Sequence, residues 1–336
     1  MPSTPRTRPD AANAATPAPG PAADPIAAPA PAGPPLQAVL LVFLGGACYG
    51  FNATCYKIAY SWGFASAQVA AAQMWFAFAL CAVALAGERL LGRRWTRLGP
   101  ATAAKLAAIG LVSCGTSITY TYAMSVLPVP LALTMLFQFT WMGTVIQVAM
   151  TRRPPAVSQV VSAAIIVVGT VFASGLYATD LSSVDLTGIA AGLAAAFCCA
   201  LFLALSGRIQ PACSQAQRGF LICGGAVLGS HLFCPDFIVS GVLLQGIAPV
   251  GLVMGACGFF LPVILFSLGT PHLPTGLSAV LSASELPAGL LVAMLVLGEP
   301  LGAAEWAGVA VILAGVCVSQ LQFLPRRGGS DPVSGS

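Results

Sequence analysis

The sequence predicts an all-α membrane protein with ten transmembrane helices. Hydrophobic residues make up 57% of the 336-residue chain and charged residues only 7%, whereas soluble domains carry about 25% charged residues. With 14 Lys or Arg and 10 Asp or Glu, the chain cannot cover a water-facing surface. A membrane helix needs about 20 apolar residues, so ten helices with short loops fill the chain beyond residue 35. The net charge of +4 gives no reason to expect a nucleic-acid partner.

The apolar runs define the expected helices in order. Residues 1–35 come first and form a Pro- and Ala-rich segment without a continuous apolar run, which is typical of a disordered tail and not of a signal peptide. The runs then lie at 36–59, 66–87, 101–124, 129–150, 156–176, 186–206, 218–240, 246–270, 274–297 and 302–323. Pro and Gly separate several of them, as at 127–130 and 298–300. Residues 324–336 form a second tail.

The arginines predict the orientation of these spans. All twelve lie in the two tails or in connections that share one side of a ten-span protein. The connections and helix ends on the other side carry Asp180, Asp185, Asp236, Glu299 and Glu305 and no arginine. Positive residues concentrate on the cytoplasmic side. We therefore expect both termini in the cytoplasm and the spans in the inner membrane.

An internal repeat divides the expected helices into two sets. A shift of 146 residues places 120–174 on 266–320 without a gap. It superposes Pro128 on Pro274, Gly143 on Gly289, Pro154 on Pro300 and Gly169 on Gly315. The repeats would be 36–176 and 186–323, with five spans each and therefore with opposite orientations. Inverted repeats are typical of secondary transporters, which bind substrate near the midplane, between the repeats.

The second repeat ends in a recognisable pattern. The segment Leu297-Gly298-Glu299-Pro300-Leu301 is followed by Trp306, Gly308 and Gly315 at fixed spacing. This pattern resembles the end of an EamA domain of the drug/metabolite transporter superfamily. In the first copy Arg152-Arg153 replace Gly298-Glu299, and Leu286 separates Glu285 from Pro287, where the family often has Glu-Pro. The resemblance implies ten helices in two inverted halves and transport of a small metabolite, frequently export.

Glu285 is the main candidate site residue. It lies near the centre of the expected span 274–297, and a carboxylate at the bilayer midplane usually faces a cavity or a partner. Ser278, Ser282 and Gly289 share its helix face. Ser282 is therefore a second candidate. The alternative is a protonated carboxyl, or one bonded to a neighbouring helix.

Other polar residues extend the candidate site. Gln138 and Trp141 share one face of the equivalent helix in the first repeat, where they would contact a substrate or else hold helices together. Tyr120 belongs to a polar stripe of the third span, and Asn52 lies on one face of the first span with Tyr49 and Tyr56.

Two basic residues have alternative interpretations. Lys57 would either extend to the outer membrane interface or act as an anion contact or counter-charge for Glu285. His231, placed midway along the expected span 218–240, would be either a packing residue or a proton relay.

No motif points to an enzyme. The chain has no HExxH, GxSxG or Walker A pattern, and its cysteines show no CxxC spacing, so neither a cofactor nor a metal is expected. The expected function is secondary transport of a small organic metabolite (an amino acid, an amine or a drug-like compound) by alternating access. Protons are the candidate coupling ion, and the protein would act in the lipid bilayer as a monomer or homodimer. An uncoupled facilitator or channel is the alternative.

Overall fold

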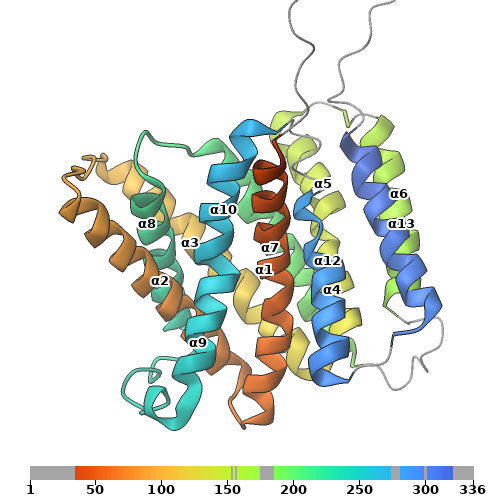
Figure 1. Cartoon of the computed structure of the whole chain (residues 1–336), viewed down its shortest axis with the longest axis horizontal. Coiled ribbons are helices and arrows are strands. Elements are labelled where there is room, and N and C mark those ends of the chain that lie inside the picture. The colour runs from red at the N-terminus through yellow and green to blue at the C-terminus, as the bar shows by residue number, and fades with distance from the viewer. Residues whose placement is uncertain are drawn as a thin grey trace, which may run out of the picture. The chain divides into compact units, whose positions relative to one another are not determined.

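The computed structural model describes residues 35–152, 154–155, 157–174, 185–273, 281–298 and 301–320, and all regular secondary structure in these ranges is helical. The first set of helices is α1 (Leu36–Ser61), α2 (Ser66–Leu90), α3 (Pro100–Val126), α4 (Val129–Phe137), α5 (Phe139–Thr151) and α6 (Val157–Ala173). The second set is α7 (Leu186–Arg208), α8 (Gln215–Ser230), η2 (Leu243–Ile247), α9 (Ala248–Gly255), η3 (Ala256–Phe260), α10 (Leu261–Gly269), η4 (Thr270–His272), α12 (Glu285–Val292), η5 (Ala293–Leu297) and α13 (Ala303–Gln320). Figure 1 shows these helices packed side by side.

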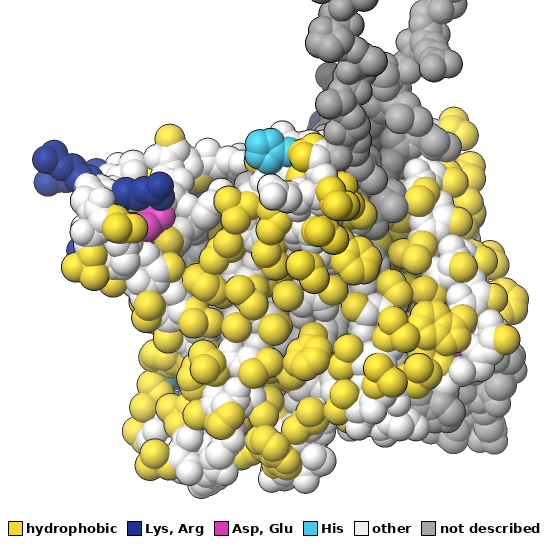
Figure 2. All heavy atoms as spheres, in the orientation of Figure 1, with side chains coloured by type: hydrophobic (Ala, Val, Ile, Leu, Met, Phe, Trp, Pro, Cys, Tyr) yellow, Lys and Arg dark blue, Asp and Glu magenta, His cyan; other side chains and the backbone are white. Residues whose placement is uncertain are grey.

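The length and composition of the helices suit a bilayer. Six of the described helices are long and apolar enough to span a membrane, counting 129–151 and 243–272 as single spans. Three further apolar helices are shorter, at Val157–Ala173, Glu285–Leu297 and Ala303–Val318. Hydrophobic side chains cover the face seen in Figure 2, and Lys and Arg side chains gather at its upper edge. The expectation of an all-helical, multi-pass membrane protein is thus confirmed.

The expected span 218–240 is wrong in its second half. The helix α8 ends at Ser230, and residues 231–240 form turns apart from Cys234. Pro235 lacks a backbone N–H and disfavours helical geometry at Cys234, so the helix cannot continue through this segment. Phe237 is fully buried and packs into the main apolar core. Hydropathy alone did not distinguish this folded turn from a continuing helix.

Two of the expected spans are interrupted at equivalent places. Gln138 separates α4 from α5, with φ −61° and ψ −14°, and Ser284 precedes α12, with φ −57° and ψ −16°. These two residues are 146 positions apart. Pro287 has no N–H to donate to the carbonyl of Ala283. This carbonyl accepts instead from the Leu286 amide, three residues on, at 3.3 Å, and the tighter turn explains the second interruption. Residues 274–280 of the expected ninth span lie outside the described residues.

The helices α6 and α13 form a reciprocal, antiparallel pair (Figure 1). A Cβ on Gly169 would lie 2.7 Å from Cγ1 of Ile312, and a Cβ on Gly315 would lie 2.8 Å from Cγ1 of Ile166. Each of these contacts becomes the other on a shift of 146 residues. Reciprocal contacts of this kind are typical of two-fold symmetry, and small residues allow the close approach.

The described arginines lie at one end of the helices, which we call the arginine end. The Arg218 guanidinium donates to the carbonyl and hydroxyl oxygens of Ser206, at 2.7 and 2.6 Å, and so joins the start of α8 to the end of α7. The side chain of Gln217 exchanges two hydrogen bonds with the backbone of Thr96, between α2 and α3. The start of α1 and the end of α13 lie at this same end (Figure 1).

The opposite end carries Asp185, which caps α7. Its Oδ1 accepts hydrogen bonds from the Thr187 hydroxyl at 2.6 Å and from the Thr187 amide at 2.8 Å. These bonds hold the pKa of Asp185 below its usual range, and the bond from the Thr187 hydroxyl contributes most to this lowering. This stabilisation is present above the pKa of the Asp185 carboxyl in the unfolded chain, which is about 3.9. It is lost as the pH falls through the lower pKa of the same carboxyl in the folded protein.

We expect Asp185→Ala to lower the unfolding temperature at pH 7, because the backbone amides of Thr187 and Gly188 at the start of α7 lose their acceptor. Asp185→Asn keeps an acceptor oxygen and should fall between the parent and the Ala variant. It should also remove the decline in stability below the carboxyl pKa. Thermal unfolding of the purified protein from pH 7 to pH 3 measures both effects. Equal stability of the parent and the Ala variant at pH 7 would refute the cap.

Candidate functional site

A cavity of about 640 Å³ lies between helices of both sets, a size that suits a small molecule. Residues of α1, α2, α3, α4, α5, α6, α7, α8, η3, α10, α12 and α13 line it. Its polar lining consists of Tyr49, Asn52, Tyr56, Gln73, Ser113, Thr116, Ser117, Tyr120, Thr140, Trp141, Thr144, Gln147, Gln159, Ser162, Ser282 and Glu285. Most of the remaining lining is apolar, including Phe137, Phe139, Phe202, Phe259 and Phe266.

The cavity approaches the arginine end of the helices and is closed toward the other. On the arginine side its lining reaches Gln147, which is exposed and lies one turn from the end of α5. On the opposite side it stops at Tyr56, Tyr120 and Phe137, which belong to the largest apolar core. That core continues toward the end opposite the arginine end, where Asp185 lies, through residues such as Leu127 and Ile247. The structure therefore has one accessible side and one sealed side.

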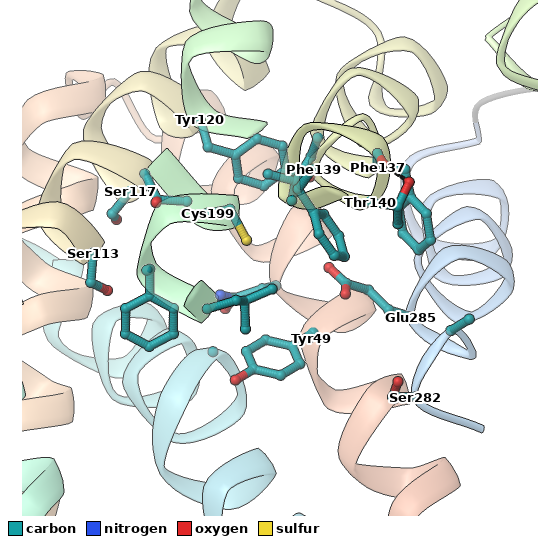
Figure 3. Close-up of a pocket in the computed structure, with 18 of the residues that line it drawn as sticks. Tyr49, Ser113, Ser117, Tyr120, Phe137, Phe139, Thr140, Cys199, Ser282 and Glu285 are labelled. Carbon is teal, nitrogen blue, oxygen red and sulfur yellow. Dashed lines mark hydrogen bonds between the residues drawn. The ribbon is translucent and has the colours of Figure 1, made fainter. Parts of the chain in front are cut away.

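Glu285 is the acidic residue of this lining. It is the first residue of α12, directly after the interruption at Ser284, whose hydroxyl donates to the carbonyl of Phe43 in α1 at 2.8 Å. Figure 3 shows the Glu285 carboxylate pointing into the cavity, toward Phe139 and Cys199. Among the described residues it has no hydrogen-bond or ion-pair partner, and it is half-buried. An ionisable side chain inside a membrane protein is costly and usually marks a functional site, so Glu285 is the main candidate in this cavity.

A hydrogen-bonded network holds the closed side of the cavity. The Asn52 amide donates to the Tyr56 hydroxyl at 3.0 Å, and this hydroxyl donates to Oε1 of Gln73 at 2.9 Å. Ser117 donates to the same Gln73 oxygen at 2.9 Å. The Oδ1 atom of Asn52 and the hydroxyl of Tyr120 are buried without a partner. Both residues line the cavity, but these two atoms have almost no accessible surface, so a ligand can supply the missing hydrogen bonds only when the side chains turn toward it.

Gln138 and Trp141 occupy different positions relative to the cavity. Trp141 lines it, and its indole N–H donates to Oε1 of Gln138 at 2.8 Å. Gln138 itself is buried behind the lining, where it donates to the Thr170 hydroxyl at 2.7 Å and to the Thr134 carbonyl at 3.0 Å. All of its polar atoms are thus engaged in joining α4 and α5 to α6. The geometry favours the helix-holding alternative for Gln138.

Lys57 and His231 lie outside the cavity lining. The Lys57 ammonium donates to the carbonyl of Leu127 at 2.6 Å, at the end of α3. His231 is not midway along a span but follows the last residue of α8, because that helix ends early. Its Nδ1 donates to the Val227 carbonyl at 2.8 Å, and its ring packs edge-on against Trp75. Neither residue is placed to contact Glu285 directly.

Of the candidate residues, the structure brings together Glu285, Ser282, Trp141, Tyr120 and Asn52. The sequence stripe that includes Asn52 also contains Tyr49 and Tyr56, and both line the cavity. Phe139, Phe202 and Phe259 were not among the candidates. Only Phe139 carried a signal, since it stands 146 positions before Glu285.

Apolar helices that cross a membrane around a cavity with an isolated carboxylate define a polytopic membrane protein of the transporter class. Comparison with curated proteins agrees. The chain is 29% identical over 210 residues to the threonine/homoserine exporter RhtA of Escherichia coli K12, which is 60% of this chain and 66% of the exporter. It is 28% identical over 199 residues to RhtA of Salmonella typhimurium SL1344, which is 58% of this chain and 64% of the exporter.

The match thus spans slightly less than two thirds of those exporters. RhtA is an EamA-type transporter of the drug/metabolite transporter superfamily, so the resemblance drawn from the sequence is confirmed. These relatives are membrane exporters and not enzymes. No protein-family model matches the chain. A crystal structure of a protein with 17% identity superposes with a TM-score of 0.57, over 85% of this chain and 97% of that one, and this likeness concerns the fold alone.

Proposed function

We propose that the protein is a secondary transporter that exports a small organic metabolite across the inner membrane by alternating access. The carrying observation is the central cavity, in which the unpartnered carboxylate of Glu285 stands at a helix break between the two sets of helices. The substrate would be an amino acid, an amine or a drug-like compound. The RhtA relatives are exporters of threonine and homoserine, which supports both the amino-acid option and the direction.

Three observations support ten spans in two inverted repeats, 36–176 and 186–323. The helix breaks at Gln138 and Ser284 are 146 residues apart and have nearly equal backbone angles. The pair α6 and α13 is antiparallel and reciprocal. The buried faces of α1 and α7 also correspond at a shift of 150 residues. The corresponding buried residues are Ala38, Val42, Gly45, Gly46 and Gly50, which are five of those buried in α1, and Gly188, Gly192, Ala195, Ala196 and Ala200 in α7.

The arginine end would face the cytoplasm, with both tails on that side. The cavity, which approaches this end and is sealed at the other, would then be the inward-facing state. Export requires the apolar core around Leu127 and Ile247 to separate while the arginine end closes. Such an exchange of open and closed ends is the motion expected of two rocking halves.

Uptake into inverted membrane vesicles, with and without an imposed pH difference, tests the proposal against an uncoupled facilitator. A coupled transporter accumulates its substrate above the outside concentration only when the pH difference is present. A facilitator equilibrates the substrate in both conditions. Failure of the protein to move any small amine, amino acid or neutral analogue in reconstituted vesicles would contradict the transporter itself.

Water access distinguishes cavity positions from buried and lipid-facing ones. In a background without the eleven cysteines, Cys at Thr144 or Tyr120 should react with a charged, water-soluble thiol reagent, and substrate should protect it. Cys at Gln138 should react slowly, because that side chain lies behind the lining. Cys at Val83, a residue 70% exposed on the apolar surface, is the lipid-facing control and should stay inert. If Cys at Thr144 were as inert as Cys at Val83, water would not fill the cavity.

A further inference from the structure

We infer that the cavity selects organic ammonium ions, with Glu285 as counter-ion and aromatic side chains as walls, over anions and zwitterions of equal size. This inference rests on the proposed function and selects the amine from its three substrate classes. The relatives favour the amino-acid option instead, and tight binding of a zwitterionic amino acid is therefore the result that would overturn the inference. It is carried by the charge of the lining, by the aromatic groups near the carboxylate and by two buried oxygen atoms without partners.

The charge of the lining has one sign. Among the described residues that line the cavity, Glu285 is acidic and none is Lys, Arg or His. Lys57 donates to the Leu127 carbonyl outside the lining. Arg208 borders an adjoining hollow of about 390 Å³ between α5 and α7, which shares Phe139 and Gln147 with the cavity and lies next to the arginine end. A substrate carboxylate would therefore find hydroxyl, amide and indole donors in the cavity lining but no cationic partner, whereas an ammonium group would pair with Glu285.

Aromatic groups surround the carboxylate. Figure 3 shows Phe139, Tyr49 and Tyr120 around the space into which Glu285 points. Tyr49 and Tyr120 line the same cavity as Glu285. Aromatic faces attract cations, and the attraction is stronger when water is excluded. They offer no comparable attraction to an anion.

The two unpartnered oxygen atoms supply the remaining acceptors. The Tyr56 hydroxyl donates its only proton to Gln73, so the group that donates to Tyr56 must be the amide nitrogen of Asn52. The Oδ1 atom of Asn52 is therefore the free one, and it can only accept. This atom and the Tyr120 hydroxyl have almost no accessible surface, so a ligand reaches them only when the side chains turn toward the cavity. They would then accept from an N–H or O–H donor, which an ammonium group supplies and a carboxylate group does not.

Binding of four probes with the same phenyl ring tests the inference on the purified full-length protein. They are 2-phenylethylamine (a cation), 2-phenylethanol (neutral), 3-phenylpropionate (an anion) and phenylalanine (a zwitterion). Titration calorimetry at pH 7 should give a dissociation constant for the amine at least about tenfold lower than for the other three. This ratio corresponds to a difference of about 1.4 kcal/mol in binding free energy. Propionate or phenylalanine binding as tightly as the amine would overturn the inference.

Variants assign the preference to its residues. Glu285→Gln should raise the dissociation constant of the amine to that of the alcohol and leave the alcohol unchanged. The matched control is Glu88→Gln, which removes a carboxylate that pairs with Arg93 outside the cavity and should change neither. If Glu285→Gln does not fold, Phe139→Leu should weaken the amine more than the alcohol. Equal weakening of both ligands by either cavity variant would show a steric role and refute the charge assignment.

Flux through reconstituted vesicles separates this inference from the proposed function. Preferential binding of the amine without flux of any probe would refute transport and leave the cation preference standing. Flux of propionate or phenylalanine, with none of the amine, would refute the cation preference and leave transport standing.

Discussion

Glu285→Gln is expected to abolish coupled transport and to leave the fold intact. Glutamine keeps the size and hydrogen-bonding capacity of a protonated carboxyl, but it neither releases a proton nor carries a charge. Since Glu285 has no hydrogen-bond or ion-pair partner among the described residues, its replacement removes no such bond in that part of the chain. The free energy of unfolding should change by less than about 1 kcal/mol, while accumulation driven by a pH difference should disappear.

The remaining activity of Glu285→Gln identifies the role of the carboxyl. Retained exchange of substrate without accumulation indicates a proton relay. Loss of amine substrates with neutral substrates kept indicates a counter-ion. Accumulation of substrate in vesicles measures coupled transport, and counterflow of labelled substrate measures exchange. Glu88→Gln, at a surface ion pair, is the control. A variant with unchanged rate, pH dependence and substrate range would show that Glu285 is structural.

Adding one methyl group at Gly308 is expected to cause a large loss of stability. A Cβ at this position would meet the backbone of α6, at 2.7 Å from both Cα of Ala173 and the carbonyl carbon of Phe172. Backbone atoms cannot rotate away as a side chain can, so α6 and α13 must separate. Overpacking of this kind costs about 1–3 kcal/mol. The free energy of unfolding of Gly308→Ala in detergent, measured by denaturant titration, should fall by that amount.

Gly87→Ala is the matched control, because Gly87 is also helical and has no atom within 4 Å of the added methyl. It should be neutral or stabilising by up to about 1 kcal/mol, since alanine favours the helix more than glycine. If Gly308→Ala were as stable as Gly87→Ala, the close approach of α6 and α13 would not exist in the folded protein.

Glu285 was accessible to sequence reasoning because a carboxylate in an apolar run is rare and stands out. His231 was misplaced because the apolar residues Leu232, Phe233 and Phe237 extend the run beyond the true end of α8. Hydropathy measures the preference for an apolar environment, and a turn packed into the core satisfies that preference as well as a helix does. The partner of Lys57 was also beyond reach, since no side-chain pattern reveals a backbone carbonyl 70 residues away.

The aromatic walls of the cavity were equally hidden. Phe259 lines the cavity, whereas Phe43 and Phe197 are exposed on the apolar surface, and all three lie in apolar helices. In a soluble helix, polar residues would mark the outer face. In a membrane helix the outer face is as apolar as the inner one, so the sequence alone cannot tell which face a phenylalanine occupies.

The two helix breaks are alike in their backbones and unlike in their side chains. At the first, Gln138 is tied to Thr170 and Trp141; at the second, Glu285 is left open. If the proposed repeats exchange conformations during transport, identical repeats would give the inward-facing and outward-facing states equal free energy. Any resting bias must then come from positions where the copies differ. The tied break is such a position, and weakening it through Thr170→Val is a direct way to shift the balance between the two states without touching the cavity.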